Sequence, residues 1–163
     1  MKRLLIAIVV VLNLVLADAV AKELAHGLLG PSAVGGARVV DVVPGLFSLA
    51  YVENRGCAWG MLQGQVWPLA AFGIVALALV VWKRRSFFGP GRLGAVAEPL
   101  LYAGIVGNVI DRLFRGYVID MLDFHWGPHH LPCFNLADTF ISVAVGLLLL
   151  ASLFGGGGAP ARN

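Results

Sequence analysis

Four apolar stretches of membrane-spanning length constrain this 163-residue chain more than any other feature of its sequence. They cover residues 4–21, 66–82, 93–110 and 136–154. A helix that crosses a bilayer needs about 17–25 mainly apolar residues. Only 13% of the residues are charged, against about 25% in soluble domains. We therefore predict an all-α membrane protein, a single membrane domain over residues 1–163 built as a bundle of four transmembrane helices.

The basic residues predict how the helices are oriented in the membrane. They precede the first span, lie between the second and third, and follow the fourth: Lys2, Arg3, Lys83, Arg84, Arg85, Arg92 and Arg162. Because cytoplasmic loops are enriched in Lys and Arg, we expect both termini in the cytoplasm. The loops 22–65 and 113–135 then face the outer side. The basic residues form no continuous stripe, so we expect no nucleic-acid partner despite a net charge of +3.

The first apolar segment has a second interpretation, as a cleavable signal peptide. Lys2 and Arg3 precede it, and Ala17-Asp18-Ala19 resembles a small-residue cleavage site. Two features favour a retained helix. The apolar run is long for a signal peptide, and Asp18 and Lys22 have the i, i+4 spacing of a helical ion pair. We expect that pair to lie on the outer surface.

The outer loop 22–65 has β character in its second half. Residues 38–43 and 46–52 are rich in β-branched and aromatic side chains and are separated by Pro44-Gly45. We predict a hairpin or small sheet on the outer membrane face, a β-rich cradle between the first and second helices. It ends in the turn 53–60, from which Trp59 can enter the membrane interface.

Two aspartates at the rim of the spans are candidate catalytic residues. An ionised side chain at membrane depth costs about 2.5–3.5 kcal/mol and persists only if paired, hydrated or used. Asp138 follows Asn135 at the start of the last span, where Asn can cap the helix. Asp120 and Asp123 would share one face of a helix but not of a strand, and the sequence leaves both open. A carboxylate pair that holds one proton can activate water and protonate a leaving amine, so Asp120 with Asp138 points to an aspartic protease.

A polar face closes the third span. Asn108, Asp111 and Arg112 are spaced i, i+3 and i+4, so they share one side of a helix. We expect this face in the interior of the bundle, where Asp111 and Arg112 neutralise each other or partners on other helices. A role in architecture is favoured over direct chemistry.

The segment 125–133 contains four potential metal ligands, His125, His129, His130 and Cys133. Its spacing matches no zinc pattern, and two prolines restrict how far it can fold back on a metal. We therefore expect no metal and no other cofactor, and a surface loop able to cover a substrate. Cys57 and Cys133 both fall on the outer side, which leaves a disulfide open.

Five motifs in a fixed order resemble bacterial lipoprotein signal peptidase, also called signal peptidase II. They span almost the whole chain: Asp18-x-x-x-Lys22, Asn54-Arg55-Gly56-Cys57-Ala58-Trp59, Gly107-Asn108-x-x-Asp111-Arg112, Val118-Ile119-Asp120 and Phe134-Asn135-x-Ala137-Asp138. The resemblance implies a membrane aspartyl endopeptidase of the bacterial inner membrane, with its active site towards the periplasmic face. It also implies the substrate, a prolipoprotein whose cysteine already carries diacylglycerol and which is cut on the N-terminal side of that cysteine. We expect a monomer that contacts membrane lipids.

The resemblance assigns a role to each matched position. The catalytic dyad falls on Asp120 and Asp138. Six further positions line the active site or hold its shape: Asn54, Gly56, Asn108, Arg112, Asn135 and Ala137. Three positions are structural or position the substrate: Asp18, Lys22 and Asp111. The chain departs from the family pattern at Ala19, at Cys57 and in the tail Gly155–Gly158, and none of these departures touches the dyad.

Two other classes of protein remain open on the residues alone. A small transporter or channel could use acidic residues as a proton relay, although no acid sits near the middle of a predicted span. A scaffold could use the same polar residues only to pack helices. The peptidase interpretation adds an expectation of its own, that residues 54–59 and 125–133 form a lid over a substrate arriving from the bilayer.

Overall fold

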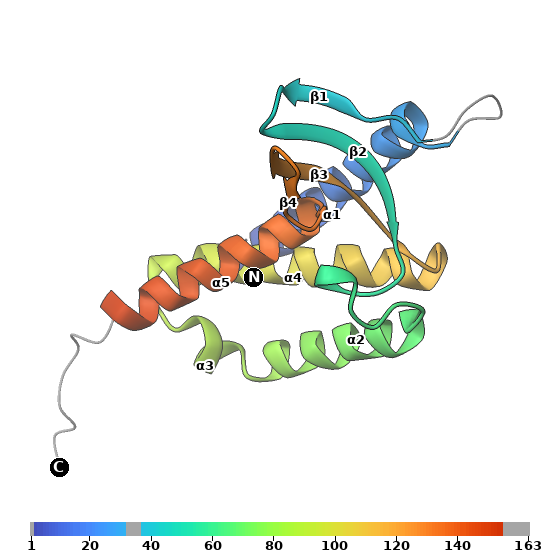
Figure 1. The fold of residues 1–163 in the computed structure, drawn as a ribbon. Coiled ribbons are helices and arrows are strands. Elements are labelled where there is room, and N and C mark those ends of the chain that lie inside the picture. Colours follow the sequence, from blue (N-terminus) through green and yellow to red (C-terminus); the bar gives the residue numbers. More distant parts are fainter. Residues whose placement is uncertain (1, 32–36, 155–163) are drawn as a thin grey trace, which may run out of the picture.

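The computed structural model describes residues 2–31 and 37–154, whose arrangement is shown in Figure 1. Within these residues the elements are α1 (Lys2–Leu29), β1 (Val40–Val43), β2 (Phe47–Asn54), α2 (Val66–Trp82), α3 (Arg84–Phe88), α4 (Arg92–Phe114), β3 (Val118–Trp126), β4 (His129–His130) and α5 (Leu136–Phe154). A short 3-10 turn covers Ala58–Gly60. Arg162 and the glycines Gly155–Gly158 lie outside the described residues.

Three of the described helices are long and apolar enough to cross a membrane, namely Leu5–Leu29 of α1, all of α4 and all of α5. The helix α2 is also apolar but has 17 residues. Large apolar side chains cover the outer surfaces of these helices, and Phe72 and Leu153 are 72% and 75% exposed. Because water disfavours so much exposed apolar surface and lipid does not, the chain is a multi-pass membrane protein.

Helix α4 is the centre of the helical part and packs against α1, α2 and α5 (Figure 1). A cluster that includes Val80, Phe88, Leu101 and Ala144 joins α2, α3, α4 and α5. The approach of α4 to α5 requires a small residue at Gly104, because a Cβ there would lie 2.5 Å from the Ala137 carbonyl oxygen. Small residues allow helix backbones to pack this closely in membranes.

The strands form one antiparallel sheet in the order β1-β2-β3-β4. The predicted hairpin of β1 and β2 is present, with Gly45 at φ 77° in its turn. Strand β3 comes from the segment between α4 and α5, and it pairs with β2 from Phe47↔Phe124 to Asn54↔Val118. The segment that contains Asp120 and Asp123 is therefore a strand and not a helix. Asp120 and Asp123 consequently point to opposite faces of the sheet.

The sheet rests on the end of α1. Ala25 and Leu29 of the helix form a buried cluster with Tyr51, Ile119 and Met121 of the two central strands. This contact explains why α1 continues to Leu29, beyond the apolar stretch 4–21, since its last two turns bury apolar side chains against strands rather than lipid.

Candidate active site

Asp120 lies near the start of β3, where two amide side chains hold it. Its Oδ1 accepts a hydrogen bond from Asn135 Nδ2 at 2.7 Å, and its Oδ2 accepts one from Asn54 Nδ2 at 2.9 Å. The carboxyl is only 2% exposed. Burial, together with the nearby charge of Asp138, raises the pKa of Asp120 to about 7, although the two amide donors act to lower it. Asp120 therefore exchanges a proton near neutral pH.

Asp138 lies in the first turn of α5 and is bound to the same asparagine. Its Oδ2 accepts from the backbone N–H of Asn135 at 3.3 Å, and its own backbone N–H donates to Asn135 Oδ1 at 3.0 Å. These reciprocal bonds have the pattern of a capping box, as the predicted cap at Asn135 requires. Asn108 Nδ2 donates to Asp138 Oδ1 at 2.7 Å. Asn135 thus contacts both carboxylates.

The two carboxylates line one pocket of about 560 Å³. Its polar lining also includes Asn54, Asn108 and Arg112, while Val118, Phe134 and Ile141 are among its apolar walls. Residues 131–133, which belong to the predicted lid, and Thr139, to which the sequence assigned no role, line the pocket as well. The i, i+4 spacing of Thr139 from Asn135 places it on the same helical face and is the signal in the sequence that points to it.

Behind the dyad lies a buried cation, Lys22, which is 1% exposed. Its Nζ lies 2.7 Å from Asp18 Oδ2 and 2.9 Å from Asp111 Oδ2, and it donates to Asn108 Oδ1 at 3.2 Å. The predicted pair of Asp18 and Lys22 is therefore confirmed, but its predicted position on the outer surface is wrong. The three N–H groups of the ammonium find three acceptors in the interior, which offsets the cost of burial.

Asp18 also binds the start of α5. Its Oδ1 accepts the backbone N–H of Ala137 at 2.9 Å, where the positive end of the helix dipole favours an anion. The contact requires small neighbours, since a Cβ at Gly107 would lie 2.6 Å from Asp18 Oδ2. Asp18 is thus an integral part of the fold, which favours a retained first helix.

Asp111 and Arg112 do not pair with each other. Asp111 contacts Lys22 and, through its Oδ1, Arg115 Nε at 3.0 Å. Arg112 instead donates to two backbone carbonyls, Gly56 O at 3.0 Å and Asn108 O at 3.2 Å. Asp111 is thus neutralised by a partner on another helix, which is one of the two arrangements that the sequence left open. Arg112 follows neither, because its hydrogen-bond partners are backbone carbonyls in its own helix and in the turn after β2.

Gly56 fixes the turn that holds Asn54. Its N–H donates to Asn54 Oδ1 at 2.9 Å, which orients the amide so that Nδ2 faces Asp120. A Cβ on Gly56 would lie 2.4 Å from the Met61 carbonyl oxygen, so no larger residue fits without moving the turn. Together with Arg112, this glycine ties the turn after β2 to α4.

The third aspartate and the two cysteines singled out in the sequence do not join the carboxylate pair. Asp123 contacts His130 rather than the two carboxylates. Cys57 and Cys133 line the same pocket with free thiols, so the structure contains no disulfide between these two described residues. Burial raises the pKa of Cys133 to about 12, which keeps this thiol protonated.

The raised pKa of Asp120 predicts how stability depends on pH. Between about pH 4 and pH 7 the folded protein keeps a proton that the unfolded chain releases, so the free energy of unfolding falls as the pH rises through this range. We expect the Tm of the wild type in detergent to fall from pH 5 to pH 8, and the Asp120→Asn variant to show a smaller fall. Equal slopes for the two proteins would contradict this origin of the pH dependence.

Two carboxylates, Asp120 buried and Asp138 partly buried, are bridged by one asparagine at the boundary between apolar helices and a small sheet. This is the arrangement of an aspartic protease in a membrane. Comparison with known proteins agrees. The family model described as signal peptidase (SPase) II matches residues 8–154. The chain belongs to the signal peptidase II family, and it is a protease. The alternative classes of transporter and non-enzymatic scaffold are thereby set aside.

Individual relatives support the same family. The chain is 43% identical over 115 residues to the lipoprotein signal peptidase of Syntrophotalea carbinolica, covering 69% of this chain and 71% of that protein. It is 33% identical over 133 residues to the lipoprotein signal peptidase of Vibrio cholerae, covering 79% and 77%. A solved bacterial membrane enzyme determined by the in meso method superimposes with a TM-score of 0.76 at 26% identity, covering 96% of this chain and 94% of that one.

Proposed function

We propose that the chain removes the signal peptide from prolipoproteins whose cysteine carries diacylglycerol, and that it cuts on the N-terminal side of that cysteine. The observation that carries the proposal is the joint binding of Asp120 and Asp138 by Asn135 at one pocket with apolar walls. Relatives over most of the chain are named lipoprotein signal peptidase, which supports this substrate class.

In the proposed mechanism the two carboxylates share one proton and hold the attacking water between them. Burial favours the protonated form of Asp120, so Asp120 polarises the scissile carbonyl while Asp138 takes a proton from the water. The leaving amine receives its proton from the dyad. Asn54, Asn108 and Asn135 keep the carboxylate oxygens in place, which reduces the reorganisation required during the reaction.

The proposed setting is a four-helix bundle of the bacterial inner membrane, with α2 as the fourth span, both termini in the cytoplasm and the dyad towards the periplasm. The sheet then forms a cradle on the outer face. Substrate enters laterally, because its acyl chains lie in the same leaflet and apolar residues such as Ile141 and Val143 line the pocket. The chain acts as a monomer.

Two segments form the proposed lid over the dyad. Cys57–Gly60, which follow β2, and Leu131–Cys133, which follow β4, line a second pocket of about 370 Å³ that also contains Asp120. Trp59 in the first segment is 73% exposed and has φ 60°, a backbone conformation that a bulky residue rarely adopts. Strain of this kind is common in segments that move during function.

Substrate lipidation is the first test of the proposal. The purified protein in proteoliposomes receives a prolipoprotein with the diacylglyceryl cysteine, or the same protein with Cys→Ser at that position. We expect cleavage only next to the modified cysteine, with kcat/KM at least about 100-fold higher than for the unmodified protein, since each buried CH₂ contributes about 0.8 kcal/mol. Equal cleavage of both substrates would contradict the proposed substrate class, and cleavage of neither would contradict the activity.

A further inference from the structure

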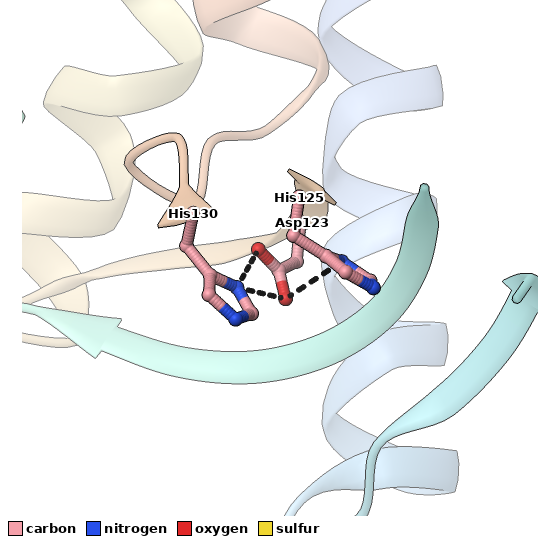
Figure 2. A group of neighbouring side chains, drawn as sticks. All are labelled: Asp123, His125 and His130. Atoms are coloured by element: carbon pink, nitrogen blue, oxygen red, sulfur yellow. Dashed lines mark hydrogen bonds and ion pairs between the residues drawn. The ribbon is translucent and has the colours of Figure 1, made fainter. Parts of the chain in front are cut away.

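Outside the dyad network, one acid and two histidines gather on the hairpin of β3 and β4. Figure 2 shows the side chains of Asp123, His125 and His130 converging there. His130 Nδ1 lies 2.9 Å from Asp123 Oδ1 and 3.0 Å from Oδ2. The imidazole rings of His125 and His130 are stacked, with centroids 4.9 Å apart.

Strand geometry explains why these three side chains meet. Asp123 and His125 are two residues apart on β3, so they share one face of the strand. His130 on β4 is the register partner of His125, and cross-strand partners hold their Cβ atoms about 4.5–5.5 Å apart. Gly127, with φ 58°, allows the tight turn between the strands. The hairpin therefore places three ligand side chains side by side.

One nitrogen of this cluster has no protein partner among the described residues. His125 Nδ1 is buried and has no hydrogen-bond partner among the described residues. Asp123 Oδ2, the carboxylate oxygen facing it, lies 3.7 Å away, which is too far for a hydrogen bond. A buried polar atom without a partner costs about 1–3 kcal/mol. His125 Nδ1 and Asp123 Oδ2 are therefore placed so that one cation between them could bind to both atoms.

The spacing of the ligand atoms fits a metal ion. One atom of each residue can be chosen so that all three lie within 4.8 Å of one another. Zinc binds imidazole nitrogen and carboxylate oxygen at about 2.0–2.2 Å, which puts neighbouring ligand atoms of a tetrahedral site roughly 3.3–3.6 Å apart. His130 is the exposed residue of the three, with 54% of its side chain accessible. Its ring can therefore move enough to bring the three ligand atoms to the spacing of a zinc site.

We propose that Asp123, His125 and His130 form a zinc site. Two imidazoles and one carboxylate are ligands that zinc prefers, and a water molecule would complete the tetrahedron. The site would join β3 to β4 immediately before Leu131, where the pocket-lining segment begins. This revises the expectation of no metal, which considered only residues 125–133 and therefore omitted Asp123.

Zinc binding by the full-length protein in detergent micelles tests the proposal independently of any cleavage assay. The protein carries a purification tag without histidine, is stripped with EDTA and is then titrated with ZnCl₂ by calorimetry. We expect one zinc ion per chain. Asp123→Ala, His125→Gln and His130→Ala should each weaken binding by at least about tenfold, the scale of effect seen even for residues behind metal ligands. Circular dichroism and Tm establish that each variant is folded.

The chain offers matched controls for each ligand type. His129→Ala changes the neighbouring histidine, whose ring faces Trp126, and His26→Ala changes the histidine on α1. Cys133→Ser removes the nearest thiol along the chain. All three should bind zinc as the wild type does. The proposal is overturned if the wild type binds no stoichiometric zinc at 1 mM ZnCl₂, or if His130→Ala binds as tightly as the wild type.

Discussion

Asp120→Asn and Asp138→Asn, made singly, are each expected to lower the rate of prolipoprotein cleavage by at least about 10³-fold. Either change removes one carboxylate from the pair that would activate the water and supply the proton, and acid-base catalysis contributes about 10²–10⁴-fold. Because the two groups would act as a unit, the double variant should be no slower than either single variant. Single-turnover cleavage in proteoliposomes measures all three rates.

Asp123→Asn is the matched control for this experiment. It changes an aspartate on the same strand that faces the opposite side of the sheet and contacts His130 instead of the dyad. Assayed in EDTA, which removes any bound metal, it should cleave at the wild-type rate. Normal cleavage by Asp120→Asn or Asp138→Asn would remove that residue from the catalytic pair. Circular dichroism and Tm establish that a variant that has lost cleavage is still folded.

Lys22→Met is expected to destabilise the fold strongly. It preserves the length of the side chain but leaves the carboxylates of Asp18 and Asp111 buried without their shared cation. Breaking a buried ion pair in this way costs about 3–5 kcal/mol. We expect a large fall in Tm, or loss of folded protein in detergent, measured by a thermal shift and by size-exclusion chromatography.

Lys83→Met provides the control for the loss of a positive charge. Lys83 is exposed at the end of α2, with its ammonium 4.6 Å from the centre of the Trp82 ring, and its replacement should change the Tm little. The triple variant Lys22→Met, Asp18→Asn and Asp111→Asn removes all three charges and should recover part of the lost stability. If Lys22→Met melted like Lys83→Met, the buried cation would not support the fold.

The sequence predicted the polar residues of the site better than their surroundings. The i, i+4 spacing of Asp18 and Lys22 predicts an ion pair, because neighbours on one helix are visible in a single segment. Their burial depends on Asp111 and Asn108, which come from another helix and complete the bonds of the ammonium. Without knowledge of those partners, the sequence led us to expect the pair of Asp18 and Lys22 at the surface. The error therefore lies in tertiary contacts that no local pattern contains.

The same limit explains why the sequence did not decide whether the segment with Asp120 and Asp123 is a helix or a strand. Their segment becomes a strand because it pairs with β2, more than sixty residues earlier in the chain. Its own residues are compatible with a helix or a strand, since propensity is weaker than pairing. The hairpin of β1 and β2 was predictable because its turn and both strands are contiguous. The histidine cluster depends on the hairpin of β3 and β4. The prolines and histidines of residues 125–133 do not indicate a strand, so the sequence did not predict this hairpin.

The contact between Asp18 and Ala137 has a consequence for the order of events during biogenesis. These residues are 119 positions apart in a chain of 163, so the ribosome makes most of the chain between them. Until α5 enters the membrane, Asp18 lacks its backbone partner, and Asn108 lacks Asp138 and Asn135. The polar centre is therefore completed by α5, the last of the described elements to be synthesised. A nascent chain that stops short of α5 lacks Asp138, so on the proposed mechanism we expect it to have no protease activity in the membrane.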